Sequence, residues 1–241
     1  MPRYDVYLEI SKTGAVVAHV PDLLGCHLFA DNSATAMARL GERVAGYIEW
    51  RRSIRIAVPS LGGRRQLSVV EEALTDALTG APGARAFFAW DAQPLTKSQR
   101  AEALRILNAS RSALLTLVEG IHPRVMRWAP APKSRSVQRN LTHLERRERW
   151  YLSRLGITIP PPKGTSVRDQ LDHTRDTVVD ALNNLDETTL GVVFEPRRGA
   201  ANNIEKWSAR KVVRRLVEHE LEHIDVIRDI IRRYSESSRI N

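Results

Sequence analysis

Residues 219–223, H-E-L-E-H, contain the side chains of this 241-residue chain that are best suited to chemistry. Residues four apart on an α-helix lie one above the other, so His219 and His223 can reach a common metal ion. A third histidine, His143, lies far upstream in another segment with apolar flanks. In a folded bundle the three imidazoles could converge on one divalent metal and leave a coordination position open for a ligand.

The helix expected at 207–234 must present these histidines correctly. Both lie at one edge of its apolar stripe, which consists of Val213, Leu216, Val217, Ile224, Ile227 and Ile231. By the same helical wheel, Glu220 falls near the centre of the stripe, whereas Glu218 and Glu222 are expected to point outward.

The helix expected at 136–155 repeats this arrangement, with His143 at the edge of its stripe and Glu148 inside it. An inward carboxylate costs free energy unless a cation or a hydrogen-bond partner meets it, and a metal or its bound water is such a partner. We therefore treat Glu148 and Glu220 as candidate catalytic residues that orient water or accept a proton. The alternative is that both only fix histidine tautomers.

Residues 219–223 also satisfy the H-E-x-x-H pattern of zinc peptidases. Those enzymes need a third ligand downstream, usually a histidine or a glutamate. After His223 there is no histidine, and the only glutamate is Glu236, in a polar terminal tail. The short pattern can arise by chance, so peptidase activity is disfavoured.

Composition narrows the remaining classes. Hydrophobic content of 42% and charged content of 27% are ordinary for a soluble globular protein, and no apolar run could span a bilayer. No signal peptide is recognisable, and a single cysteine, Cys26, indicates the reducing cytoplasm.

The net charge of +9 raises the question of nucleic-acid binding. Most of the excess is arginine interspersed with acidic residues, as in residues 145–149, which is typical of a solvated helix face. Basic runs with exposed aromatic residues and zinc-finger spacings are absent. Nucleic acid is therefore not expected as a partner.

The first part of the chain reads as a small α+β domain over residues 1–66. Alternating apolar residues predict strands at 4–10, 15–20 and 26–30, followed by a helix that Asn32 or Ser33 can cap. Residues 54–58 indicate one further strand, which gives a β-β-β-α(-β) order.

A short helix at 67–79 and a linker to residue 95 are expected next. The aromatic cluster at 87–90 in that linker is expected to pack between domains. From residue 96 to 241 the pattern is helical, without strands, and predicts a four-helix bundle. Its helices are expected at 96–119, 136–155, 166–185 and 207–234.

Two segments of this bundle resemble a known family. Residues 136–148, S-V-Q-R-N-L-T-H-L-E-R-R-E, resemble the second-helix signature of DinB/YfiT-like metalloproteins. W-S-A-R-K at 207–211, followed by residues 219–223, is similar to the start and the ligand pair of their last helix. The resemblance covers about 95 to 235.

This resemblance implies a four-helix bundle, usually dimeric, that holds a divalent metal through His143, His219 and His223. Zinc or nickel is expected first, and iron or manganese also suits such a site. Characterised relatives include S-transferases and isomerases that use low-molecular-weight thiols such as mycothiol or bacillithiol. A small-molecule substrate, with such a thiol as candidate co-substrate, is therefore implied.

The first domain resembles a different family. V-P-D-L-L-G-C-H at 20–27, followed by A-D-N-S-A-T-A at 30–36, is similar to the N-terminal fold of HicB-type antitoxins. Cys26 belongs to that pattern, which favours a packing role over a reactive thiol. No DNA-binding segment of the antitoxin type follows, so we expect ligand sensing or interaction from this domain.

Two main hypotheses result, beside a third and weaker one, an Arg-rich nucleic-acid binder. The first is a metal-dependent transferase or hydrolase, with thiol dependence as a variant. The alternative is a non-enzymatic interaction or regulatory protein that uses the HicB-like domain, with a structural or vestigial metal site. The remaining histidines lack a comparable context and are expected to be structural or exposed: His19, His27, His122 and His173.

Overall fold

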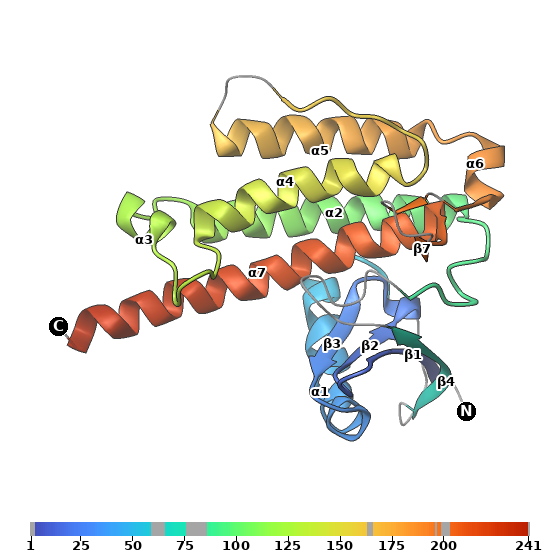
Figure 1. The fold of residues 1–241 in the computed structure, drawn as a ribbon, viewed down its shortest axis with the longest axis horizontal. Coiled ribbons are helices and arrows are strands. Elements are labelled where there is room, and N and C mark those ends of the chain that lie inside the picture. The colour runs from blue at the N-terminus through green and yellow to red at the C-terminus, as the bar shows by residue number, and fades with distance from the viewer. Residues whose placement is uncertain are drawn as a thin grey trace.

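A four-stranded sheet with one long helix forms the N-terminal unit (Figure 1). The computed structural model describes residues 3–58, 66–75, 86–162, 166–195, 197–198 and 203–240. The strand order is β3-β2-β1-β4, with β1 antiparallel to β2, β2 antiparallel to β3, and β1 parallel to β4. The elements are β1 (Arg3–Ser11), β2 (Val16–Val20), the single turn η1 (Pro21–Leu23), β3 (Cys26–Ala30), α1 (Ser33–Ser53) and β4 (Gln66–Thr75).

The first three strands and α1 confirm the sequence prediction. Tyr4, Val6 and Leu8 of β1 are buried, as their alternation required. Asn32 caps α1, and its side chain accepts a hydrogen bond from the amide of Thr35 at 2.8 Å. Cys26 is buried, and burial raises the pKa of its thiol to about 12, which fits a packing role.

Two predictions about the end of this unit were wrong. Residues 67–75 lie in strand β4 and not in a helix, because β1 offers a free edge along which β4 pairs in parallel. Residues 76–79 of the predicted helix lie outside the described residues. Residues 54–58 form no strand: after α1 the chain turns at Arg55, with φ of 56°, and the amide of Ile56 donates to the Arg51 carbonyl.

The predicted four-helix bundle is confirmed. Helices α2 and α7 pack on each other, α4 packs on both α5 and α7, and α2 also contacts α5. The long helices are α2 (Lys97–Val118), α4 (Val137–Ser153), α5 (Val167–Asn183) and α7 (Ala209–Ile240). Between them lie α3 (Pro123–Arg127), α6 (Glu187–Gly191) and two short strand pairs, β5 (Val193–Phe194) with β8 (Trp207–Ser208) and β6 (Arg197–Arg198) with β7 (Asn203–Ile204). The expectation that this part of the chain contains no strands was therefore wrong.

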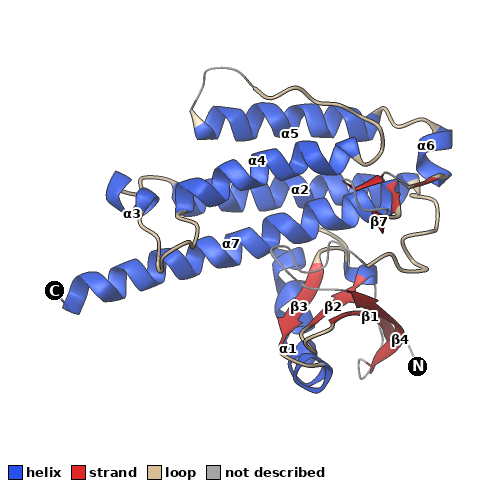
Figure 2. Ribbon diagram, in the orientation of Figure 1, coloured by secondary structure: helices blue, strands red, loops and turns tan. Residues whose placement is uncertain are grey.

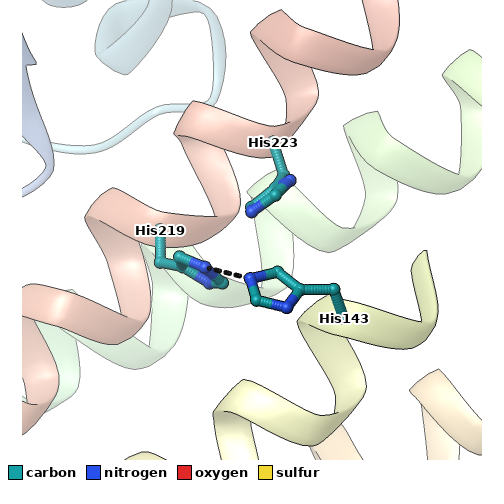
Figure 3. Close-up of side chains that lie close together, drawn as sticks. All are labelled: His143, His219 and His223. Carbon is teal, nitrogen blue, oxygen red and sulfur yellow. Dashed lines mark hydrogen bonds between the residues drawn. The ribbon is translucent and has the colours of Figure 1, made fainter. Parts of the chain in front are cut away.

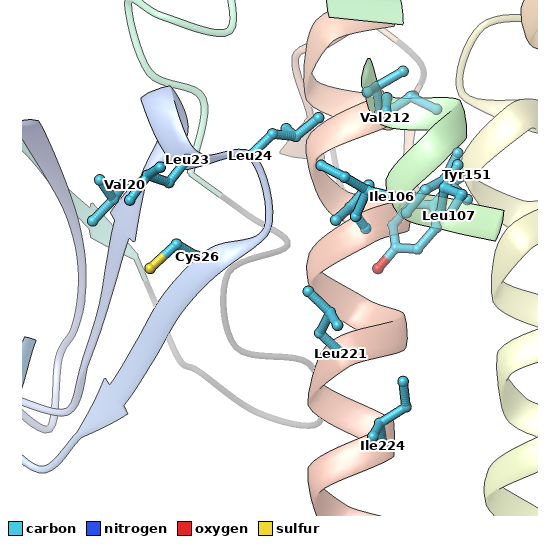
Figure 4. Close-up of a cluster of buried hydrophobic side chains, with 14 of the residues drawn as sticks. Val20, Leu23, Leu24, Cys26, Ile106, Leu107, Tyr151, Val212, Leu221 and Ile224 are labelled. Carbon is cyan, nitrogen blue, oxygen red and sulfur yellow. The ribbon is translucent and has the colours of Figure 1, made fainter. Parts of the chain in front are cut away.

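Helix α7 lies between the bundle and the N-terminal unit (Figure 2). In Figure 4, Leu23, Leu24 and Cys26 lie on one side of this helix, whereas Leu107 and Tyr151 lie on the other. One continuous apolar core includes residues of both units. Consequently α7, which carries two of the candidate ligands, is covered on two opposite sides.

The aromatic cluster packs between the two units, as expected. Phe88 is fully buried, with ring centroids 5.3 Å from Tyr7 and 5.5 Å from His19 on the sheet. The guanidinium of Arg214, on α7, lies 5.3 Å from the Phe88 ring and forms hydrogen bonds of 2.9 and 2.8 Å with both carboxylate oxygens of Asp91.

Among the described residues, no helix is long and apolar enough to cross a membrane.

Candidate metal centre

Three histidines from two helices meet between α4 and α7 (Figure 3). His143 comes from α4, and His219 and His223 come from consecutive turns of α7. One ring nitrogen of each lies within 4.8 Å of the others. The structure thus brings together the three residues that the sequence singled out as metal ligands.

Burial keeps these imidazoles neutral. His219 and His223 are 2% and 7% exposed, and His143 is half-buried. Burial lowers the pKa of His143 to about 4 and that of His223 to about 3, and nearby arginines add to both effects. Burial likewise lowers the pKa of His219 well below its ordinary value. At neutral pH each ring therefore has a nitrogen lone pair available for a metal.

The spacing of the rings suits one metal ion. The Nε2 atoms of His219 and His143 are 3.3 Å apart. Two nitrogens bound to one tetrahedral zinc at about 2.0–2.1 Å lie roughly 3.3–3.4 Å from each other. A set of three imidazoles suits zinc, nickel, iron or copper, so these donors fit a divalent transition metal.

Asn140, which the sequence analysis did not single out, fixes the orientation of one ligand. Its Nδ2 donates to the Ser136 carbonyl at 2.9 Å, so its Oδ1 faces His223 Nδ1 at 2.8 Å. Because an amide oxygen only accepts, His223 must carry its proton on Nδ1, which leaves Nε2 free to bind metal. The available sequence signal was its position on α4, one turn before His143.

Replacing Asn140 by alanine is expected to weaken zinc binding by about 10–100-fold, because His223 loses the partner that fixes its tautomer. Competition with a chromophoric chelator measures this change. Gln138→Ala, an exposed position on the same helix, is the matched control and should bind zinc like the wild type. An unchanged affinity in a folded Asn140 variant would show that the hydrogen bond does not position the ligand.

Glu148 and Glu220 lie in a buried cluster with two arginines from other helices. Arg111, on α2, donates to Glu220 Oε1 at 2.7 Å and to Glu148 Oε1 at 2.9 Å. Arg175, on α5, donates to Glu220 Oε2 at 2.9 Å and also binds Glu148. Ser110 Oγ donates to Glu220 Oε2 at 2.5 Å. Among the described residues, neither carboxylate hydrogen-bonds to a candidate ligand.

This cluster keeps Glu220 charged. Burial alone raises the pKa of its carboxyl group, but Arg175 and Arg111 outweigh that effect and lower the pKa to about 2. The inward carboxylates therefore have cationic partners, as their position required, and the partners are guanidinium groups. The cluster therefore connects four helices, and a catalytic role for Glu148 and Glu220 stays a prediction.

Glu218 and Glu222 do not point outward, contrary to the prediction. Glu218 is 1% exposed, 2.8 Å from His19 Nδ1, and accepts from Arg215 at 2.8 Å. Glu222 is partly exposed and lies 3.4 Å from His27 Nε2. The N-terminal unit covers the side of α7 that a wheel assigns to solvent, and His19 and His27 are buried there as structural residues.

The bundle is similar to one known superfamily. Residues 106–227, half of the chain, match the model of the DinB superfamily. One solved structure, described as "YfiT from Bacillus subtilis is a probable metal-dependent hydrolase with an unusual four-helix bundle topology", matches at 15% identity with a TM-score of 0.45, and the match covers 58% of this chain and 90% of that chain. No curated protein sequence matches.

The superfamily match includes α4 and residues 209–227 of α7, and all three histidines lie within it. It does not extend to the N-terminal unit, whose resemblance to HicB-type antitoxins stays a prediction. On the evidence of this match, the chain belongs to the DinB superfamily.

Proposed function

We propose that this protein is a divalent-metal-dependent enzyme, a transferase or hydrolase that acts on a small molecule at His143, His219 and His223. The observation that carries the proposal is the convergence of three neutral imidazoles within 4.8 Å, one of them half-buried and accessible. Zinc or nickel is the proposed metal, and a low-molecular-weight thiol is a proposed co-substrate. A homodimer, implied by the family resemblance, is also proposed.

A divalent metal held by His143, His219 and His223 would supply a Lewis acid that lowers the pKa of a water or thiol. The chain itself supplies the preorganised donors. Asn140 fixes the tautomer of His223, and the Tyr151 ring meets the His219 ring edge-on, with centroids 5.7 Å apart. The Arg–Glu cluster connects the helices that carry the ligands, so the donors hardly need to reorganise when a metal binds.

The composition of the donor set favours an enzyme over a protein with a structural metal. Structural zinc sites are usually closed by four protein ligands, whereas catalytic sites retain three and an open position. Within the described ranges, the group that could hold a metal contains the three histidines and no fourth cysteine, histidine or carboxylate. This count supports a position left for substrate.

Metal analysis of protein purified without a nickel column tests the proposal. We expect about one divalent ion per chain in the wild type and none in His143→Ala, because two imidazoles on one helix bind far more weakly than three. His173→Ala, an exposed histidine on α5, is the matched control and should retain the metal. A wild type that binds neither zinc nor nickel when these are offered would refute the proposal.

A further inference from the structure

The accessible side of the metal centre is the side of His143. This ring is half-buried, whereas His219 and His223 are almost completely buried. A ligand that reaches the metal must therefore approach along the α4 surface around His143. The charges on that surface decide which ligands are attracted.

Three arginines surround this approach. Arg147 lies one turn after His143 on α4, Arg146 is its neighbour, and Arg135 precedes the helix. Because residues four apart share a helix face, Arg147 lies beside His143, and the charges of Arg135 and Arg146 also act on that ring. The guanidinium groups of Arg135 and Arg147 also repel each other, since the Arg147 charge lowers the pKa of Arg135. Positive charge therefore converges on the centre.

These arginines differ from the buried ones in their surroundings. Arg111, Arg175, Arg214 and Arg215 each form ion pairs with buried carboxylates. In the described part of the chain, by contrast, no carboxylate forms an ion pair with Arg135, Arg146 or Arg147. Arg147 lies over the Trp150 ring, 5.0 Å from its centroid, which restricts the guanidinium without neutralising it.

We infer that the substrate is a small organic anion whose carboxylate or phosphate group is bound by Arg135 and Arg147. This inference rests on the metal-dependent function proposed above. Neutral histidines, a divalent metal and the arginines together make the accessible side strongly positive. The planar guanidinium fork matches the oxygen geometry of carboxylate and phosphate groups, and its charge attracts both over a distance.

Calorimetric titration with inorganic phosphate and with succinate tests this inference, on zinc-loaded and on metal-free protein. We expect the wild type to bind at least one probe, and the double variant Arg135→Gln/Arg147→Gln to bind it about tenfold more weakly or worse. Arg168→Gln removes an exposed charge on α5 and is the matched control, with unchanged affinity. Preference for phosphate would identify a phosphate ester, and preference for succinate a carboxylate.

Metal content, measured on the same samples, separates this inference from the proposed function. The double variant should keep its zinc, because the histidines are intact. Equal probe affinity in wild type and double variant, or no probe binding by zinc-loaded wild type, would overturn the inference while a full zinc content preserved the proposed function. If the wild type bound no metal, arginine-dependent binding of phosphate or succinate by the metal-free protein would still support the inference.

Discussion

Replacing Glu220 by alanine is expected to lower the free energy of unfolding by about 3–5 kcal/mol, because it leaves buried guanidinium charge uncompensated. Arg111 and Arg175 are 5% and 4% exposed, and each donates to Glu220. Without that carboxylate, Glu148 alone faces two cations. Urea unfolding at neutral pH, followed by circular dichroism, measures the loss.

A control exists on the same helix. Glu236 pairs with Arg232 at 2.7 Å on the exposed end of α7, where both side chains are more than half exposed. Removing such a surface pair costs about 1 kcal/mol or less, so Glu236→Ala should unfold nearly like the wild type. Equal effects of the two substitutions would mean that water reaches Arg111 and Arg175 in the folded protein.

Acid titration gives a second readout of the same cluster. The pKa of Glu220 is lowered to about 2 in the folded protein, below its ordinary value of 4.5. A group whose pKa is lower in the folded protein than in the unfolded protein stabilises the fold fully above its unfolded-state pKa. This stabilisation is lost as the pH falls to the folded-state pKa. Wild-type stability should therefore decline between about pH 4.5 and 2, and less steeply in Glu220→Gln.

The helices and the histidine convergence could be predicted because their signals are local. A period of 3.6 residues fixes which side chains share a face, and His219 and His223 followed directly from it. The wheel failed where α7 has two covered sides. The helical wheel predicted that Glu218 faces solvent, whereas the N-terminal unit buries that carboxylate against His19.

The rest depends on partners that are distant in sequence. Residues 66–75 contain good helix formers, and their pairing with β1 overrides that propensity. The run 145–149 is typical of a solvated face, but Glu145 is buried as well as Glu148, which the helical wheel had placed inside. The need of an inward carboxylate for a cation was inferred correctly. The identity of this cation, a guanidinium group, could not be inferred, because Arg111 and Arg175 come from two other helices.

The contact between the N-terminal unit and the ligand helix leads to the second large effect, expected for Gly25→Ala. Gly25 has φ of +95°, and a Cβ added there would lie 2.5 Å from Val217 Cγ1 and 2.6 Å from the Tyr47 hydroxyl. The backbone conformation costs about 1–3 kcal/mol for a non-glycine residue, and overpacking adds about 1–3 kcal/mol. We expect a loss of roughly 2–6 kcal/mol in urea unfolding.

Gly41→Ala is the matched control, because Gly41 lies in α1 with no atom within 4 Å of an added Cβ. It should raise stability by about 0.5–1 kcal/mol, as glycine is a poor helix former. If the Gly25 variant were as stable as the Gly41 variant, the loop that contains Gly25 could move away from α7 without lowering the free energy of unfolding. The expected loss arises from strain on Val217, two residues before His219, and measuring it would show that the N-terminal unit supports the helix that presents the metal ligands.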